Sequence, residues 1–304
     1  MDPHDGRGDI ERETIRHVSD AFAEDPLRIL RMARFAARFG FDAAPVTLEF
    51  ARELAPHIPA LPGERLRLEL EKAMKQAKSP RKFFDVLRRA DALGKTFPEI
   101  QKMTEVPAGP SKHHGEGSTY EHTMWVLQEM NELRPNNYRG LLAALVHDLG
   151  KIMTPSEKLP HHYRHTKRGL RTIEMMAERL AMSNQEVKIM KEAVKHHHRV
   201  SKIPKMNVST LLDLVTGTGN LELLIDLCEA DRKGREPKKE FDRKSVERLI
   251  GAVESTVKEI DGKSVLQEHG YDRGSIGTEI SGGDFGDLVR KHRIEKIRER
   301  LPSS

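Results

Sequence analysis

The chain has 304 residues, of which 37% are apolar, 5% aromatic and 33% charged, and 52 Lys and Arg against 47 Asp and Glu give a net charge of +5. This mild excess is compatible with a polyanionic partner, but it does not prove one. The single cysteine excludes an internal disulfide framework, and no apolar run reaches the roughly 18 residues of a membrane span. The composition therefore predicts a cytoplasmic protein without a membrane partner.

The first strong element is an amphipathic helix within "EDPLRILRMARFAARFG" at residues 24–40. Leu27, Leu30, Ala33 and Ala37 recur at helical spacing and predict one packed face. Four arginines fall within about a third of the helix circumference: Arg28, Arg31, Arg34 and Arg38. The spacing therefore predicts a second, basic face.

Helical periodicity continues through the rest of the chain. Short Pro, Gly or polar breaks separate the further predicted helices, at about 46–56, 63–78, 79–93, 119–133, 138–149, 166–181, 184–198, 208–215, 219–231, 242–260 and 284–300. No convincing alternating strand pattern and no internal repeat are present, so the sequence predicts an all-α fold. The richest break, "VPAGPSKHHGEGS" at 106–118, predicts a domain boundary.

Most of the 15 histidines lie between residues 113 and 231. His147 and Asp148 follow the apolar stretch "LLAALV", and a buried imidazole and carboxylate are costly unless a divalent cation satisfies both. His122 on its own is more typical of an ordinary core or surface histidine. Together with Asp231, however, the three residues form a mixed nitrogen and oxygen ligand set from three helices, which suits a transition metal or Mg²⁺ with open positions for water and phosphate.

These four residues resemble the H…HD…D set of the HD superfamily of metal-dependent phosphohydrolases, and the "HDLGK" extension strengthens the resemblance. It implies a helical domain that hydrolyses phosphate esters, with His147 and Asp148 catalytic and with Mg²⁺, Mn²⁺ or Ni²⁺ as the metal. Other residues are candidates for a second metal or for phosphate contacts, or else are surface groups beside a polar cleft: His114, Lys151, His165 and His197.

A wider resemblance covers almost the whole chain. "VSDAFAEDPLRILRMARFAARFGF", "GERLRLELEKAM", "HHGEGSTYEHT", "LPHHYRH" and "CEADRKGR" resemble, in order, segments of bacterial CCA-adding tRNA nucleotidyltransferases that carry an HD tail domain. The resemblance implies a head-neck junction and base-reading helix at 1–40, RNA-binding neck and body helices at 41–110, an HD phosphohydrolase domain at 111–235 and a C-terminal helical tail at 236–304.

Members of that family add C, C and A to the tRNA 3′ end, and their "EDPLR" motif reads the incoming CTP or ATP. The resemblance therefore assigns nucleotide binding to Asp25 and Arg28, with Arg31 on the same helix, and it implies the tRNA 3′ end as partner. A carboxylate beside a guanidinium can imitate a base edge. Without the resemblance, Asp25 and Arg28 are an ordinary helix-surface pair.

One part of the family pattern is missing. Nucleotidyl transfer needs two metal ions held by carboxylates, and no Asp-x-Asp on a strand-like run occurs in the sequence. "DPHDGRGDI" resembles the segment that joins head to neck, so we expect ATP and CTP to be substrates only with a separate or missing head, and an open apolar face near residues 1–22 where that head docks.

Two alternatives are a free-standing HD phosphohydrolase acting on RNA ends and a non-catalytic tRNA-binding subunit. The base-reading helix argues against a phosphohydrolase alone, because such an enzyme has no use for it. The intact metal-ligand set argues against a non-catalytic subunit. We therefore expect a component of tRNA 3′-end repair that also hydrolyses phosphate esters.

Overall fold

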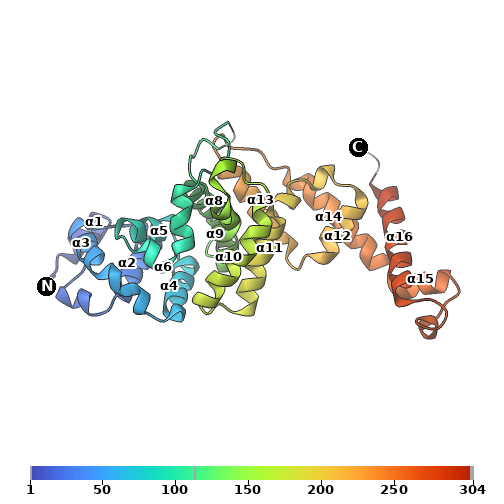
Figure 1. The fold of residues 1–304 in the computed structure, drawn as a ribbon, viewed down its shortest axis with the longest axis horizontal. Helices are drawn as coiled ribbons and strands as arrows, with labels where there is room; N and C mark the ends of the chain where they lie inside the picture. The colour runs from blue at the N-terminus through green and yellow to red at the C-terminus, as the bar shows by residue number, and fades with distance from the viewer. Residues whose placement is uncertain (1, 113, 302–304) are drawn as a thin grey trace. The chain divides into compact units, whose positions relative to one another are not determined.

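The computed structural model describes residues 2–112 and 114–301, and helices make up nearly all of its regular structure (Figure 1), which confirms the all-α prediction. The α-helices are α1 (Gly6–Glu11), α2 (Leu27–Phe39), α3 (Pro45–Leu54), α4 (Gly63–Lys75), α5 (Pro80–Arg89), α6 (Leu93–Thr96), α7 (Pro98–Lys102), α8 (Thr119–Leu133), α9 (Tyr138–Val146), α10 (His165–Arg179), α11 (Asn184–Val200), α12 (Val208–Gly217), α13 (Leu221–Lys233), α14 (Arg243–Glu259), α15 (Gly262–Glu268) and α16 (Gly282–Arg300). The 3-10 helices are η1 (Asp20–Glu24), η2 (Ala55–Ala60), η3 (Met103–Glu105), η4 (Leu149–Met153), η5 (Ser156–Lys158), η6 (Ile203–Lys205) and η7 (Arg273–Ser275).

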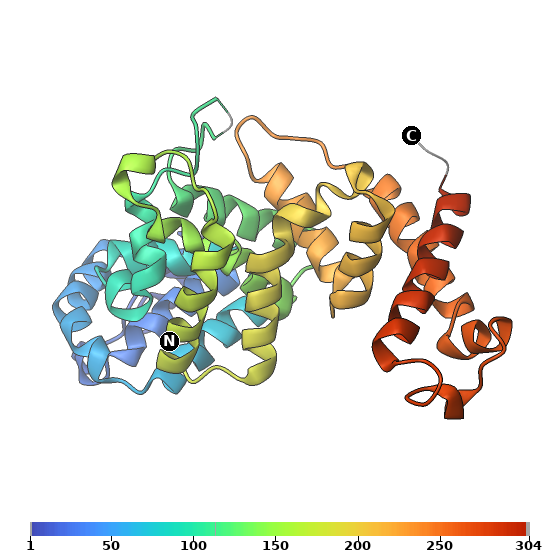
Figure 2. The same cartoon turned by 45° about the vertical axis from the view of Figure 1, so that its right-hand side comes forward.

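The chain forms two compact units. The first comprises the residues up to His197 together with Asp226–Glu240, and the second comprises His198–Ile225 and the residues from Phe241 onward. In the second unit α14 packs against α12 and α16, and α15 packs against α16 (Figure 2). No helix among the described residues combines the length and the apolarity needed to cross a bilayer. The four-part division expected from the family resemblance stays a prediction.

The first unit is built around α2, which packs against α4 and α5. The predicted apolar face is present, since Leu30, Ala33 and Ala37 are buried. Gly40 ends the helix with φ 76°, in the left-handed region that a glycine adopts without strain.

The basic face of α2 is not uniformly exposed. The Arg34 Nε–H donates to Glu69 of α4 at 2.7 Å, and the two side chains are only 12% and 5% exposed. Lys72 supplies a second cation to the same carboxylate at 3.1 Å. The helical spacing predicts Arg34 on the basic face with the other arginines. The packing of α4 against α2 instead buries Arg34, and its ion pair with Glu69 has a structural role.

We predict that Arg34→Met lowers the free energy of unfolding by about 3 kcal/mol, because it leaves the buried Glu69 carboxylate with only Lys72. Arg38→Met, on the exposed part of the same helix, is the matched control and should change it by less than about 0.5 kcal/mol. Urea unfolding followed by circular dichroism measures both. Equal midpoints for the two variants would refute the structural role of the pair.

Two short strands escape the sequence pattern. β1 (Thr14–Ile15) pairs in parallel with β2 (Asp42–Ala43), with Thr14 opposite Asp42. A strand of two residues shows no alternation, so periodicity cannot reveal it. The ladder holds the N-terminal segment against the end of α2.

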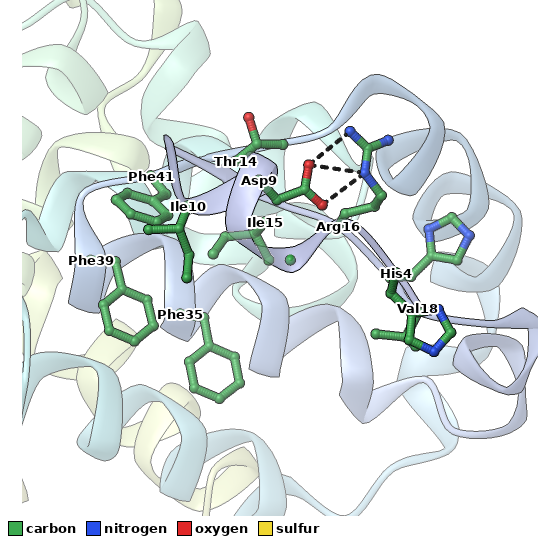
Figure 3. Close-up of a pocket in the computed structure, with 12 residues that line it drawn as sticks. His4, Asp9, Ile10, Thr14, Ile15, Arg16, Val18, Phe35, Phe39 and Phe41 are labelled. Atoms are coloured by element: carbon green, nitrogen blue, oxygen red, sulfur yellow. Dashed lines mark hydrogen bonds and ion pairs between the residues drawn. The ribbon is translucent and has the colours of Figure 1, made fainter. Parts of the chain in front are cut away.

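An apolar hollow of about 540 Å³ opens beside this ladder. Figure 3 shows Ile10 and Ile15 facing Phe35, Phe39 and Phe41, and Ile10 is 66% exposed. The predicted apolar face near residues 1–22 is therefore present, although the phenylalanines of α2 and the residues after it supply much of its surface. We call these five side chains the N-terminal hollow.

Candidate functional site

Three helices of the first unit bring the predicted metal ligands together. His122 lies on α8, His147 and Asp148 directly follow α9, and Asp231 lies on α13. The His122 Nε2 is 3.0 Å from Asp231 Oδ1 and 3.4 Å from His147 Nε2, and the His147 Nε2 is 3.2 Å from Asp148 Oδ2. All four residues are buried.

Local sequence explains where α8 and α9 begin. The Ser118 hydroxyl caps α8 by accepting the Glu121 N–H at 3.1 Å, and the Asn137 side chain caps α9 by accepting the Gly140 N–H at 3.1 Å. The residues of α9 from Gly140 to Val146 are all buried. The C-terminal end of α9 therefore lies in the interior of the first unit, and the next residues, His147 and Asp148, face other helices.

A shared hydrogen-bond pattern orients four imidazoles. Each has its Nδ1 within hydrogen-bond distance of a backbone carbonyl oxygen, and each has its Nε2 near an aspartate oxygen. The pairs are His122 with Gly234 at 3.0 Å, His147 with Ala144 at 2.8 Å, His165 with His162 at 2.8 Å and His197 with Ala193 at 3.0 Å. A carbonyl oxygen only accepts, so Nδ1 carries the proton in each ring and the Nε2 lone pair faces the carboxylates.

Asp148 lies between two pairs of these imidazoles. Its Oδ2 faces His147 at 3.2 Å and His122 at 3.6 Å, while its Oδ1 faces His165 at 3.3 Å and His197 at 3.5 Å. The Asp148 side chain is buried, and Lys151 supplies a cation to its Oδ2. A buried carboxylate in these surroundings is the arrangement expected of a metal ligand.

Two cations border the site. The Lys151 Nζ is 2.7 Å from Asp148 Oδ2 and donates to the Ala108 carbonyl at 2.6 Å, and Arg235 contacts both oxygens of Asp231 at 2.8 and 2.6 Å. Burial raises the pKa of each aspartate, but the nearby cation, Lys151 or Arg235, acts together with the surrounding imidazoles and holds each pKa well below its usual range. The sequence also allowed Lys151 to be solvated, whereas the structure buries it at the site.

His114 lies apart from the Asp148 cluster and is joined to it through Glu116, a residue that the sequence analysis missed. The buried Glu116 Oε1 lies 2.6 Å from His114 Nδ1 and 3.1 Å from His122 Nδ1. Burial raises the pKa of Glu116, but the two imidazoles lower it below its usual range. The only sequence signal was its place beside the histidines in the turn "HHGEGS".

The Nδ1–H of His122 faces both the Gly234 carbonyl at 3.0 Å and the Glu116 carboxylate at 3.1 Å, and these two acceptors together keep Nε2 turned to Asp231. We predict that Glu116→Gln weakens Mn²⁺ binding about tenfold, because the neutral amide orients the ring less firmly and lowers its basicity. Isothermal titration calorimetry measures the affinity, with the exposed Glu105→Gln as control. An unchanged dissociation constant in Glu116→Gln would contradict this role.

The donor set fits a divalent ion. One ligand atom each from His122, His147 and Asp148 lie within 4.8 Å of one another, and Asp231 adds a carboxylate oxygen 3.0 Å from His122 Nε2. Mixed imidazole and carboxylate donors suit Mn²⁺, Ni²⁺ or Zn²⁺ and accept Mg²⁺.

The predicted nucleotide-binding residues lie just before and within α2. Asp25 does not pair with Arg28: its Oδ1 accepts the Leu27 N–H at 2.9 Å, and its Oδ2 contacts Arg65 of α4 at 2.8 Å. Burial raises the pKa of Asp25, but the Leu27 amide and Arg65 bring it below its ordinary value. Arg28 pairs with Glu24 at 3.3 Å.

Arg31 is exposed, and it forms no ion pair in the part of the chain that the structure describes. Arg65 therefore replaces Arg28 as the cation beside Asp25. Its only sequence signal was its place in "GERLRLELEKAM", which lies about 40 residues further along the chain.

Two family models match the chain. Residues 40–103 match a family described as the probable RNA and SrmB-binding site of polymerase A, and residues 119–235 match the HD domain family. The second range contains His122, His147, Asp148 and Asp231.

Solved structures share the fold. The crystal structure of the Bacillus stearothermophilus CCA-adding enzyme in complex with CTP has a TM-score of 0.61 at 18% identity, with 100% of this chain and 66% of that chain covered. The Thermotoga maritima CCA-adding enzyme complexed with tRNA has a TM-score of 0.54 at 16% identity, with 99% and 64% covered.

Curated relatives are closer in sequence. The multifunctional CCA protein of Alkalilimnicola ehrlichii is 39% identical over 246 residues, which cover 77% of this chain and 59% of the relative. The multifunctional CCA protein of Methylococcus capsulatus is 35% identical over 310 residues, which cover 98% of this chain and 70% of the relative. The chain thus spans 59% of the length of the first relative and 70% of the length of the second. At this identity and coverage, the chain belongs to the family of multifunctional CCA proteins and carries their HD domain.

Proposed function

We propose that the HD site of this chain hydrolyses phosphate esters at RNA or nucleotide ends with a divalent metal. One observation carries the proposal: four imidazole Nε2 atoms and the carboxylates of Asp148 and Asp231 converge in a single buried site. Such a set has little structural use, since burying six polar groups costs free energy unless a cation satisfies them.

We assign the metal ligands to His122, His147, Asp148 and Asp231, with Asp148 as the residue that can face two ions. A divalent metal there supplies Lewis acidity and a water of lowered pKa. His165 and His197, on the Oδ1 side of Asp148, are placed for a second ion or for a phosphate oxygen. Lys151 and Arg235 supply fixed positive charge that suits the phosphate group.

We further propose that Asp25, Arg28 and Arg65 read a nucleotide only when a nucleotidyltransferase head is supplied, by another polypeptide or by a further part of the same protein. The N-terminal hollow supports this proposal, because its phenylalanines form an apolar surface that a second folded unit can cover. The tRNA 3′ end would then be the shared substrate of both activities, and ATP and CTP would serve only the head.

Hydrolysis assays test the proposed HD activity. The purified chain, stripped with EDTA and reloaded with Mg²⁺, Mn²⁺ or Ni²⁺, should cleave bis(p-nitrophenyl) phosphate and 2′,3′-cyclic AMP with at least one of these metals. EDTA should abolish the reaction. A folded chain that binds metal by calorimetry and yet cleaves neither substrate with any of the three would refute the proposal.

A further inference from the structure

A second hollow of the first unit, of about 890 Å³, lies between α7, η4 and α10. It is distinct from the metal-ligand set, because none of the assigned ligands lines it. Four cationic side chains line it: Lys102, Lys167, Arg168 and Arg171. We call it the α7–α10 hollow.

The positive charge of this hollow is not compensated. Its one lining carboxylate, Glu99, already contacts Arg179 at 2.7 Å, and the four cations form no ion pair with a carboxylate among residues 2–112 and 114–301. The Arg168 Nη1 is buried and has no hydrogen-bond partner in this part of the chain. A buried guanidinium nitrogen without an acceptor is costly, so the arrangement favours an anionic ligand.

The hollow also has an apolar part. Pro98 and Ile152 line it together with Met153 and Met175, which are 53% and 61% exposed. Adaptable methionine side chains next to cations suit a ligand that combines phosphates with flat apolar groups. A nucleotide strand has this composition, whereas an acidic peptide lacks the regular alternation of charge and base.

The same two elements build both sites. Asp148 immediately precedes η4, whose Ile152 and Met153 line the hollow, and α10 begins at His165 beside Asp148 and carries Lys167, Arg168 and Arg171. A ligand in the hollow therefore contacts the elements that hold the metal-ligand set.

We propose that the α7–α10 hollow binds the sugar-phosphate backbone of single-stranded RNA beside the HD site. This inference rests on RNA as the substrate class of the proposed function. A free nucleotide shares the chemistry of phosphate and base, but cations from two separate helices suit successive phosphates of one strand better than a single phosphate group.

Fluorescence anisotropy tests the proposal with a labelled single-stranded RNA of about 12 nucleotides ending in CCA, a length within the usual site size. EDTA is present throughout, so hydrolysis does not enter the measurement. The double variant Lys167→Glu with Arg171→Glu should weaken binding at least tenfold. It should also make the negative slope of log K against log salt shallower by about 1.4, which corresponds to the loss of two phosphate contacts. Met175→Ala should weaken binding without changing the slope.

The matched control is Lys188→Glu with Lys195→Glu, two exposed lysines of α11 that change the net charge equally outside the hollow. An equal loss in the control, or no loss in the α10 variant, would overturn the proposal. Unlabelled RNA and ATP are then compared as competitors. If ATP displaces the labelled RNA at the same concentrations as unlabelled RNA does, the ligand of the hollow is a free nucleotide and not an RNA strand. Lys102→Glu on α7 should weaken binding in the same way, and it replaces the α10 variant as the test if that variant fails to fold.

The two proposals fail separately in this design. RNA binding that depends on the α7–α10 hollow, in a chain that hydrolyses no phosphate ester, supports the inference and refutes the HD activity. Hydrolysis of bis(p-nitrophenyl) phosphate without RNA binding in the hollow supports the HD activity and refutes the inference.

Discussion

Asp148→Asn is expected to reduce hydrolysis of bis(p-nitrophenyl) phosphate on the order of 10³-fold, equivalent to about 4 kcal/mol of activation free energy. Asp148 is the carboxylate that faces both imidazole pairs, so the neutral amide weakens every metal position that the site offers. It also leaves Lys151 buried beside an uncharged group. Steady-state kinetics give kcat/KM, and mass spectrometry gives the bound metal.

Glu157→Gln is the control for this prediction, because it removes one exposed carboxylate from η5 in the same part of the unit. It should retain the activity and the metal content of the unmodified chain. Asp148→Asn with full activity would show that hydrolysis does not use this site. Full metal content with lost activity would instead limit Asp148 to the reaction itself.

Gly150→Ala is expected to destabilise the first unit by about 3 kcal/mol and to disrupt the metal site at the same time. A Cβ at Gly150 would lie 2.0 Å from the His165 carbonyl oxygen and 2.6 Å from the Gly169 amide nitrogen. Both are backbone atoms, so η4 and α10 must separate. His165 would then move away from Asp148. In the native structure the His165 Nε2 lies 3.3 Å from Asp148 Oδ1.

Urea unfolding and Mn²⁺ titration measure the two consequences. The control is Gly251→Ala in α14, where no atom lies within 4 Å of the added Cβ and where alanine favours the helix by about 0.5–1 kcal/mol. Unchanged stability together with unchanged Mn²⁺ affinity in Gly150→Ala would contradict the close contact between η4 and α10.

The sequence predicts the long helices well, because their apolar periodicity and their start and stop residues indicate the same boundaries. The helix predicted at 119–133 matches α8, capped by Ser118, and the helix predicted at 184–198 ends two residues short of α11. The short helices α1, α6 and α15 were not predicted, because a helix of fewer than two turns shows no apolar periodicity. The same limit hides the two-residue ladder of β1 and β2.

Some residues of the candidate site were also predicted from the sequence, and others were not. His122, His147, Asp148 and Asp231 were grouped by residue type and spacing, and the structure brings them within contact distance. Partners supplied by tertiary packing were not accessible to such reasoning. Arg65 reaches Asp25 only because α4 packs against α2, and Glu116 reaches His122 from a loop whose backbone conformation the sequence does not specify.

The proposed division of activities, in which nucleotide addition requires a nucleotidyltransferase head, can be tested in one experiment. It uses tRNA lacking its terminal A, together with labelled ATP and a 2′,3′-cyclic phosphate substrate, in the presence of Mg²⁺, Mn²⁺ or Ni²⁺. We expect this chain alone to hydrolyse the cyclic phosphate and to incorporate no label into tRNA, with hydrolysis lost in His147→Ala. Incorporation of the label by the chain alone would contradict this division, because it would reveal a transfer site among residues that carry no Asp-x-Asp pair.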